Sequence, residues 1–289
     1  MLNNNRIVSE DNQNIIKKLE SIVKRAIQIR ASINRNGLPF NSPMQCSQDM
    51  FTIYQKIKHM AMGYAVEGGE MYKNKELLND IVYSLDYMNE NYYTKKNQQI
   101  FTGFDDWFSW DIGIPQILLQ TLVLIKDELT TEQINKYLSP INKYIPLPSM
   151  TMANRVDIAY SCVVAGAFQK DYKRIAISIE MLRVCFDYVE EGDGFYDDGS
   201  FIQHKVYAYN GGYGISLIKA FSTLTYILED TCFRFDDEMR EKQSSWIIYS
   251  FIPFLYNGAF FDLVRARGVV YDLKGQLTGI GAIIHFSWF

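Results

Sequence analysis

Apolar residues recur at helical spacing along most of this chain, and this pattern constrains its fold more than any other feature. Ile15, Leu19 and Ile22, for example, fall on one face of the first such stretch. Glycine, proline and asparagine punctuate the gaps between stretches, as in residues 145–149. The helices predicted in this way span residues 12–34, 48–64, 75–93, 113–127, 131–144, 154–168, 171–189, 212–228 and 236–256.

The succession of helical pairs predicts an all-α fold built from helical hairpins, either a bundle or an incomplete α/α toroid. The 289 residues are enough for one large domain, and we expect a single helical domain over residues 1–289. No β-rich domain with regular turn spacing is visible, and only residues 268–281 are expected to hold a short extended piece. The apolar C-terminal sequence IGAIIHFSWF predicts that further structure packs against it.

Composition and charge exclude several classes of partner. The net charge is −4 and there is no basic block, which argues against a nucleic-acid partner. The three histidines are scattered and no CxxC pair occurs, so we expect no metal and no cofactor. Cys162 and Cys185 lie in apolar surroundings and are expected to be buried. The N-terminus has no apolar signal-peptide core, and we expect neither a membrane-spanning run nor a membrane partner.

Residues 191–214 read EGDGFYDDGSFIQHKVYAYNGGYG, and this segment is too rich in glycine for an ordinary helix. A glycine-broken loop that carries His204, Tyr207, Tyr209 and Tyr213 is the kind of segment in which a scaffold holds catalytic side chains. Gly211-Gly212 predicts a tight turn that begins a helix near Tyr213. The aspartates of this loop are interpreted as turn formers rather than as a carboxylate pair; they are Asp193, Asp197 and Asp198.

Aromatic residues gather in the sequence FDDWFSWDIGIPQ, residues 104–116. Trp and Phe rings contact the apolar faces of sugar rings, while neighbouring polar groups bind hydroxyls. We therefore expect Trp107 and Phe108 to contact a ligand, and Trp110, one helical turn from Trp107, to fill a core.

Two further polar segments have both a structural and a functional interpretation. In TMANRVDIAY, residues 151–160, Asn154 is suited to cap the helix that follows. In FFDLVRARGVVYD, residues 260–272, Arg265 and Arg267 stand among apolar residues. Half-buried arginines need a partner, which is either an anionic ligand or a salt bridge to Asp262 or Asp272.

Together these four segments resemble the N-terminal catalytic domain of polysaccharide lyase family 8, which includes hyaluronate, chondroitin AC and xanthan lyases. The segments DWFSWDIGIPQ, TMANRVD, DGFYDDGSFIQHKVYAYNGGYG and RARGVVY follow the order and rough spacing of the family's motifs. The resemblance implies an incomplete α/α toroid, which β-sandwich domains follow in the family. It also implies β-elimination on a uronic-acid-containing polysaccharide, such as hyaluronan, chondroitin or xanthan, outside the cell.

The resemblance also implies residue roles. Tyr213 matches the tyrosine that acts as base and acid, and His204 matches the catalytic histidine. Asn154 matches the asparagine that binds the uronate carboxylate, and Arg267 matches the arginine that supports the tyrosine. Trp107 and Phe108 match the aromatic patch of the cleft, and Arg265 and Tyr209 are expected to bind substrate.

This chain departs from the family pattern at several positions. Asp106 stands for an asparagine, Met152 and Ala266 each stand for a glycine, and Tyr271 stands for an arginine. Two alternatives therefore remain beside the lyase. One is a domain that binds glycans without turnover, and the other is a glycoside hydrolase that uses carboxylates such as those of Asp197 and Asp198.

Overall fold

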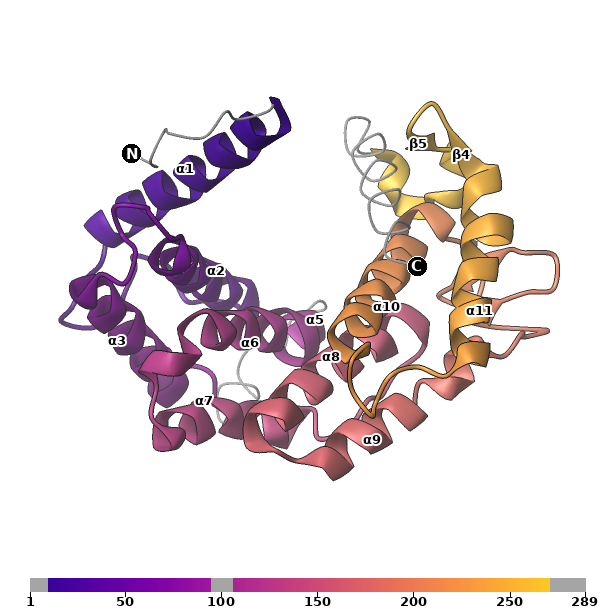
Figure 1. Cartoon of the computed structure of the whole chain (residues 1–289). Helices are drawn as coiled ribbons and strands as arrows, with labels where there is room; N and C mark the ends of the chain where they lie inside the picture. Colours follow the sequence, from indigo (N-terminus) through magenta and orange to yellow (C-terminus); the bar gives the residue numbers. More distant parts are fainter. Residues whose placement is uncertain (1–9, 95–105, 271–289) are drawn as a thin grey trace. The chain divides into compact units, whose positions relative to one another are not determined.

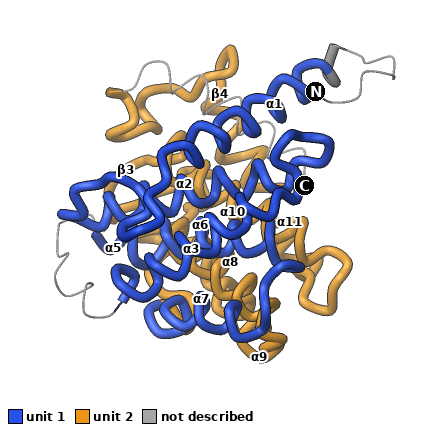
Figure 2. Tube along the Cα trace, turned by 90° about the vertical axis from the view of Figure 1, so that its left-hand side faces the viewer, with its two compact units in different colours: residues 1–144 blue, residues 145–289 orange. Residues whose placement is uncertain are grey.

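The computed structural model describes residues 10–94 and 106–270 (Figure 1). It divides the chain into two compact units, residues 1–144 and residues 145–289, which Figure 2 draws in blue and orange. The single domain expected over residues 1–289 stays a prediction, and each unit is described by itself. Helices dominate both units, as the apolar periodicity predicts.

The first unit is built around α2, which contacts α1, α3 and α6. Its apolar side chains Ile53, Ile57 and Met60 repeat at helical spacing and are fully buried. The α-helices of this unit are α1 (Glu10–Ala31), α2 (Ser47–Ala65), α3 (Lys75–Asn91), α5 (Asp106–Phe108), α6 (Ile114–Ile125) and α7 (Thr131–Tyr144). A π-helix, η1 (Ser109–Gly113), joins α5 to α6, and a 3-10 helix, η2 (Lys126–Glu128), ends this run.

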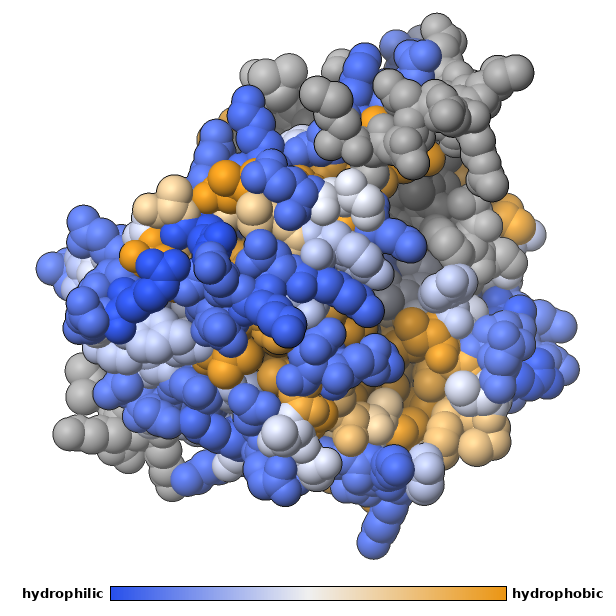
Figure 3. Space-filling view, turned by 60° about the vertical axis from the view of Figure 1, so that its left-hand side comes forward, coloured by the Kyte–Doolittle hydropathy of each residue, from blue (hydrophilic) through white to orange (hydrophobic). Residues whose placement is uncertain are grey.

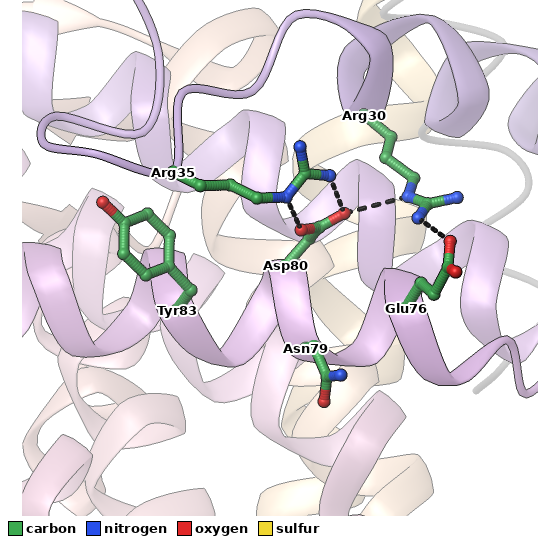
Figure 4. Close-up of a pocket in the computed structure, with 6 residues that line it drawn as sticks. All are labelled: Arg30, Arg35, Glu76, Asn79, Asp80 and Tyr83. Carbon is green, nitrogen blue, oxygen red and sulfur yellow. Dashed lines mark hydrogen bonds and ion pairs between the residues drawn. The ribbon is translucent and has the colours of Figure 1, made fainter.

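Ion pairs join α1 and the segment that follows it to α3 (Figure 4). The carboxylate of Asp80 accepts hydrogen bonds from Arg35 Nε and Nη2 at 2.6 and 2.8 Å, and from Arg30 Nε at 2.9 Å. Arg30 also donates to Glu76, which is exposed. Burial raises the pKa of Asp80, but the hydrogen bonds from the two arginines outweigh burial and lower it. The ion cluster thus ties α1 and the segment after it to α3.

The stretch Asp106–Glu128 is helical throughout and is apolar and long enough to cross a membrane by those criteria alone. The expectation that no run reaches this length was therefore wrong. However, 67% of its most apolar window is buried in the structure, as in a core helix. On the face that Figure 3 shows, hydrophilic side chains cover much of the surface, and hydrophobic side chains gather in its lower part.

The second unit packs α8 against α9 and α10, with two small sheets beside them. Its core is aromatic: Trp246 stacks on Phe195 with ring centroids 4.3 Å apart and on Phe186 at 4.9 Å. The α-helices are α8 (Met152–Gln169), α9 (Tyr172–Glu180), α10 (Ile215–Leu228) and α11 (Asp237–Trp246). The strands are β1 (Gly194–Phe195), β2 (Phe201–Gln203), β3 (Tyr207–Ala208), β4 (Leu255–Tyr256) and β5 (Ala259–Phe260).

Short helical turns complete this unit. They are the π-helices η4 (Asn210–Gly214) and η5 (Ile247–Phe251), and the 3-10 helices η3 (Arg183–Phe186), η6 (Ile252–Phe254), η7 (Asp262–Val264) and η8 (Ala266–Val270). The predicted helix 171–189 ends at Glu180, because Cys185 and Phe186 enter the core through η3 instead. Cys162 is also buried, so both cysteine predictions are confirmed.

The extended structure of the described residues lies outside the segment predicted to hold it. The strands lie within residues 194–208 and 255–260, and the predicted helix 236–256 gives way after Trp246 to η5, η6 and β4. Within residues 268–281, Gly268–Val270 belong to η8, and the rest lies outside the described residues.

Candidate functional site

A three-stranded antiparallel sheet places His204 at the tip of a hairpin. Gly194 pairs with Ile202 between β1 and β2, and Gln203 pairs with Tyr207 between β2 and β3. Phe201 and Gln203 point inward and are buried, so the hairpin is anchored on one face. His204 follows directly after β2 and is exposed. Because the hairpin is anchored in the core, it presents the imidazole to solvent from a fixed base.

Tyr213 lies in the π-helix η4, which leads into α10. The helix therefore begins near Tyr213, as the sequence predicts, but close approach rather than a left-handed turn explains the glycines. A Cβ on Gly212 would lie 2.3 Å from Tyr209 Cε1, and one on Gly211 would lie 2.9 Å from Arg265 Cγ. Single π-turns within helices are frequent at functional sites.

The rings of His204, Tyr209 and Tyr213 form a cluster, which we call the ring cluster. The His204 and Tyr213 centroids are 4.8 Å apart with an interplanar angle of 88°. Tyr209 lies 5.1 Å from Tyr213 and 6.2 Å from His204. Tyr209 is 4% exposed, whereas Tyr213 is half-buried and His204 is exposed. Burial suits Tyr209 to support the other two rings, and its contact with substrate stays a prediction.

The two arginines of the last segment have different surroundings. Arg265 is 7% exposed and donates from Nη1 to Asp262 Oδ1 and from Nη2 to the Gly268 carbonyl, both at 2.7 Å. The salt-bridge alternative with Asp262 is thus realised, while contact of Arg265 with substrate stays a prediction. Arg267 is exposed in η8, and its support of Tyr213 stays a prediction. The other proposed partner, Asp272, lies outside the described residues.

Asn154 stands in the first turn of α8 rather than at its cap. The N-cap is Thr151, with extended backbone angles of −123° and 151°, so the interpretation of Asn154 as N-cap was wrong. Asn154 is half-buried and is the third residue of the helix. Thr151 makes no capping bond with its side chain; its hydroxyl donates instead to Asp193 Oδ2 at 2.6 Å. The amide of Asn154 is therefore free of the capping role that the sequence suggested.

Asp193 and Asp198 have different roles in the loop. Asp198 accepts from the backbone N–H and the hydroxyl of Ser200, which confirms it as a turn former. Asp193 instead accepts bonds from residues distant in sequence, among them Thr151 and Gln203. This network was not predicted from the sequence, because no local sequence pattern indicates a contact between residues 42 positions apart.

In the aromatic segment of the first unit, Trp110 is buried, as predicted. It is 2% exposed and stacks on Tyr93 with centroids 5.2 Å apart, so it fills the core. Phe108 is 40% exposed and Trp107 is half-buried; their rings lie 6.1 Å apart at 90°. Both are therefore accessible in part, as ligand contact requires. Asp106 is buried and accepts the hydroxyl and the backbone N–H of Ser47, at the start of α2.

Comparison with known proteins decides the family. A model described as "Polysaccharide lyase family 8, N terminal alpha-helical domain" matches residues 2–274. The chain belongs to polysaccharide lyase family 8. A xanthan lyase of Bacillus sp. (strain GL1) is 32% identical over 77% of this chain and 24% of the relative. Hyaluronate lyase HylB of Enterococcus faecalis (strain ATCC 700802 / V583) is 27% identical over 98% of this chain and 31% of the relative.

Solved lyase structures of family 8 have the same helical fold. Paenibacillus xanthan lyase superposes with a TM-score of 0.84 at 30% identity, over 96% of this chain and 27% of the other. Chondroitin AC lyase of Streptomyces coelicolor A3 gives 0.86 at 24% identity, over 99% of this chain and 40% of the other. The predicted fold class, the helical domain of family 8, is thereby confirmed. The chain spans less than half the length of each of these proteins.

Two departures from the family 8 pattern acquire a physical meaning. Met152 and Ala266 replace glycines, and their φ angles are 41° and 43°. This left-handed region favours glycine and costs other residues about 1 kcal/mol or more. The chain therefore keeps the backbone conformation that glycine suits, although neither position holds a glycine.

Proposed function

We propose that this chain is the helical part of a lyase that cleaves a uronic-acid-containing polysaccharide by β-elimination. The observation that carries the proposal is the perpendicular approach of His204 and Tyr213, at 4.8 Å between centroids, above a buried Tyr209. Two side chains able to exchange protons thus stand together at an accessible surface. Family membership supports a lyase that acts on a glycosaminoglycan or on xanthan.

The chemistry of elimination assigns the roles of this pair. The Tyr213 oxygen, as phenolate, takes the proton from C5 of the uronate, and the C–H electron pair becomes the C4–C5 double bond. The C4–O bond breaks, and its oxygen takes the proton back from Tyr213. One tyrosine then serves as base and as acid, and the phenolate is regenerated. His204, beside the phenol ring, assists as a second base by accepting the phenol proton when the phenolate first forms.

The C5 proton is only weakly acidic, so negative charge that develops on the uronate carboxylate needs stabilisation. A neutral amide that donates hydrogen bonds can supply it, and Asn154 is proposed for this role. A nearby cation lowers the pKa of a phenol. Arg267, exposed in η8, is proposed to lower the pKa of Tyr213 once substrate is bound.

Trp107 and Phe108 are proposed to stack on sugar rings. Their perpendicular arrangement offers an apolar edge and face to a pyranose ring. Since such polymers occur outside cells, we also propose an extracellular site of action. Because the related lyases are longer than this chain, we also propose a further β-domain or a second chain as its partner.

The test of this proposal is the substitution Tyr213→Phe, measured as release of unsaturated uronide from hyaluronan, chondroitin and xanthan. It removes one oxygen and keeps the ring, so we expect turnover to fall by about 10²–10⁴-fold while polymer binding persists. Tyr172→Phe is the matched control, because Tyr172 is an exposed tyrosine of α9 that stacks on Phe233 outside the ring cluster. Near-normal turnover by Tyr213→Phe would remove the basis of the mechanism.

A further inference from the structure

The carboxylate of Asp193 collects three hydrogen-bond donors. Thr151 Oγ1 and Gln203 Nε2 donate to Oδ2 at 2.6 and 2.8 Å, and the backbone N–H of Lys205 donates to Oδ1 at 2.7 Å. Gln203 immediately precedes His204 and Lys205 immediately follows it. One carboxylate therefore binds the side chain of the residue before the histidine and the backbone N–H of the residue after it.

The conformation of this turn explains why it needs such support. His204 and Lys205 have φ angles of 56° and 69°, so two consecutive non-glycine residues lie in the left-handed region. Such backbone conformations are strained in non-glycine residues and persist only where the surrounding structure imposes them. In this turn the N–H of Lys205 donates to Asp193 Oδ1 at 2.7 Å, so the carboxylate stabilises the turn that holds the imidazole.

Asp193 also reaches the helix that carries Asn154. Its partner Thr151 is the N-cap of α8, and Asn154 follows in the first turn. The carboxylate therefore joins the His204 hairpin to the start of α8, two segments more than 40 residues apart. Any shift of one segment against the other lengthens these bonds.

The orientation of Gln203 is consistent with a fixed network. Its side chain is 1% exposed, and its Nε2 faces the carboxylate, because the flipped amide would set Oε1 against Asp193. In the described part of the chain, Oε1 has no hydrogen-bond partner. A buried acceptor left unpaired is destabilising, so the orientation of Gln203 serves the bond to Asp193.

We propose that Asp193 is a positioning residue of this site: its carboxylate fixes the left-handed turn at His204 and links it to the helix of Asn154. Its meaning for turnover rests on the proposed lyase function. Its effect on the position of the imidazole does not, and can be measured without a substrate.

The first readout is the nuclear magnetic resonance signal of the His204 ring. A perpendicular tyrosine ring at 4.8 Å displaces that signal through its ring current, and a His204→Gln variant identifies it among the three histidines. We expect Asp193→Ala to move the signal toward the position of a free histidine. Asp193→Asn keeps the side-chain shape and decides the matter if Asp193→Ala does not fold. Its amide nitrogen cannot accept, so the signal moves in the same direction. Asp197→Ala, an exposed aspartate of the same loop, leaves the signal in place.

The second readout is turnover. A displaced histidine lowers kcat by about 10–100-fold, since misplacement by about 1 Å has effects of this size, and KM changes little. A His204 signal unmoved in a folded Asp193 variant overturns the proposal. A wild-type chain without turnover on any of the polymers refutes the lyase function instead, and the resonance comparison still decides the role of Asp193.

Discussion

Substitution of Gly212 by alanine tests the close packing beneath the ring cluster. An added Cβ lies 2.3 Å from Cε1 and 2.5 Å from Cδ1 of Tyr209. Ordinary carbon–carbon contact needs about 3.5 Å, so the ring has to move by roughly 1.2 Å to clear the methyl group at 2.3 Å. Tyr209 is buried at 4% exposure, which leaves little room for that movement.

The cost follows from the packing. Overpacking of a well-filled core costs about 1–3 kcal/mol. For a domain of this size each kcal/mol lowers Tm by about 2–4 °C, so Gly212→Ala is expected to lower Tm by roughly 2–12 °C. The displaced Tyr209 ring is 5.1 Å from Tyr213, so turnover is expected to fall as well.

The assay is thermal unfolding followed by circular dichroism, with Gly268→Ala as the matched control. The same methyl group at Gly268 meets Arg265 Cβ at 3.7 Å, which is ordinary contact. We therefore expect the control to keep the wild-type Tm within about 2 °C. Equal Tm values for Gly212→Ala and wild type would show that Tyr209 does not support the cluster as described.

Three further predictions concern titration and backbone conformation. Burial raises the pKa of Asp80, but its arginine partners lower it more strongly, so the ionised carboxylate stabilises the fold above about pH 4 and this stabilisation is lost as the pH falls. Asp80→Asn should therefore lower the free energy of unfolding, measured in urea, at pH 7 and by progressively less as the pH falls. An equal loss of stability at all pH values would contradict this. Burial raises the pKa of Asp111 to about 6, above its value of about 3.9 in the unfolded chain, so stability falls as the pH rises between these two values. The free energy of unfolding of Asp111→Asn should exceed that of wild type by roughly 1–2 kcal/mol at pH 7 and equal it at pH 4. Urea titrations at the two pH values measure the difference. Ala266 has a φ of 43°, so Ala266→Gly should relieve backbone strain and raise stability by up to about 1 kcal/mol. Ala165→Gly, inside α8, should lower stability. Lower stability of both variants in thermal unfolding would refute the strain at Ala266.

The helices were predictable because their apolar faces repeat at a fixed period. Ile53, Ile57 and Met60 of α2 show the pattern, and all are buried. The π-helix that carries Tyr213 and the strands of two or three residues were not predictable, since each depends on partners elsewhere. The early end of α9 is another tertiary effect, because η3 carries Phe186 into the aromatic core.

The candidate site was predictable as a set of residue types and only partly as a geometry. The dense segment of residues 191–214 indicated His204 and Tyr213, and the structure brings their rings together. The hydrogen bonds that hold the His204 turn could not be predicted from the sequence, because Asp193 bonds to Thr151, 42 residues away. Cap statistics favoured Asn154, but the chain turns into α8 three residues earlier, where Thr151 adopts the extended cap conformation.

The measurement that tests the central claim most directly is the ultraviolet absorbance of the purified chain mixed with hyaluronan, chondroitin and xanthan in turn. β-Elimination predicts that absorbance of the conjugated unsaturated uronide rises with at least one polymer, and that Tyr213→Phe slows the rise by about 10²–10⁴-fold. New reducing ends without that absorbance would indicate hydrolysis instead. Binding by a folded chain with no new ends on any polymer would indicate a glycan-binding domain, and either result would contradict the lyase.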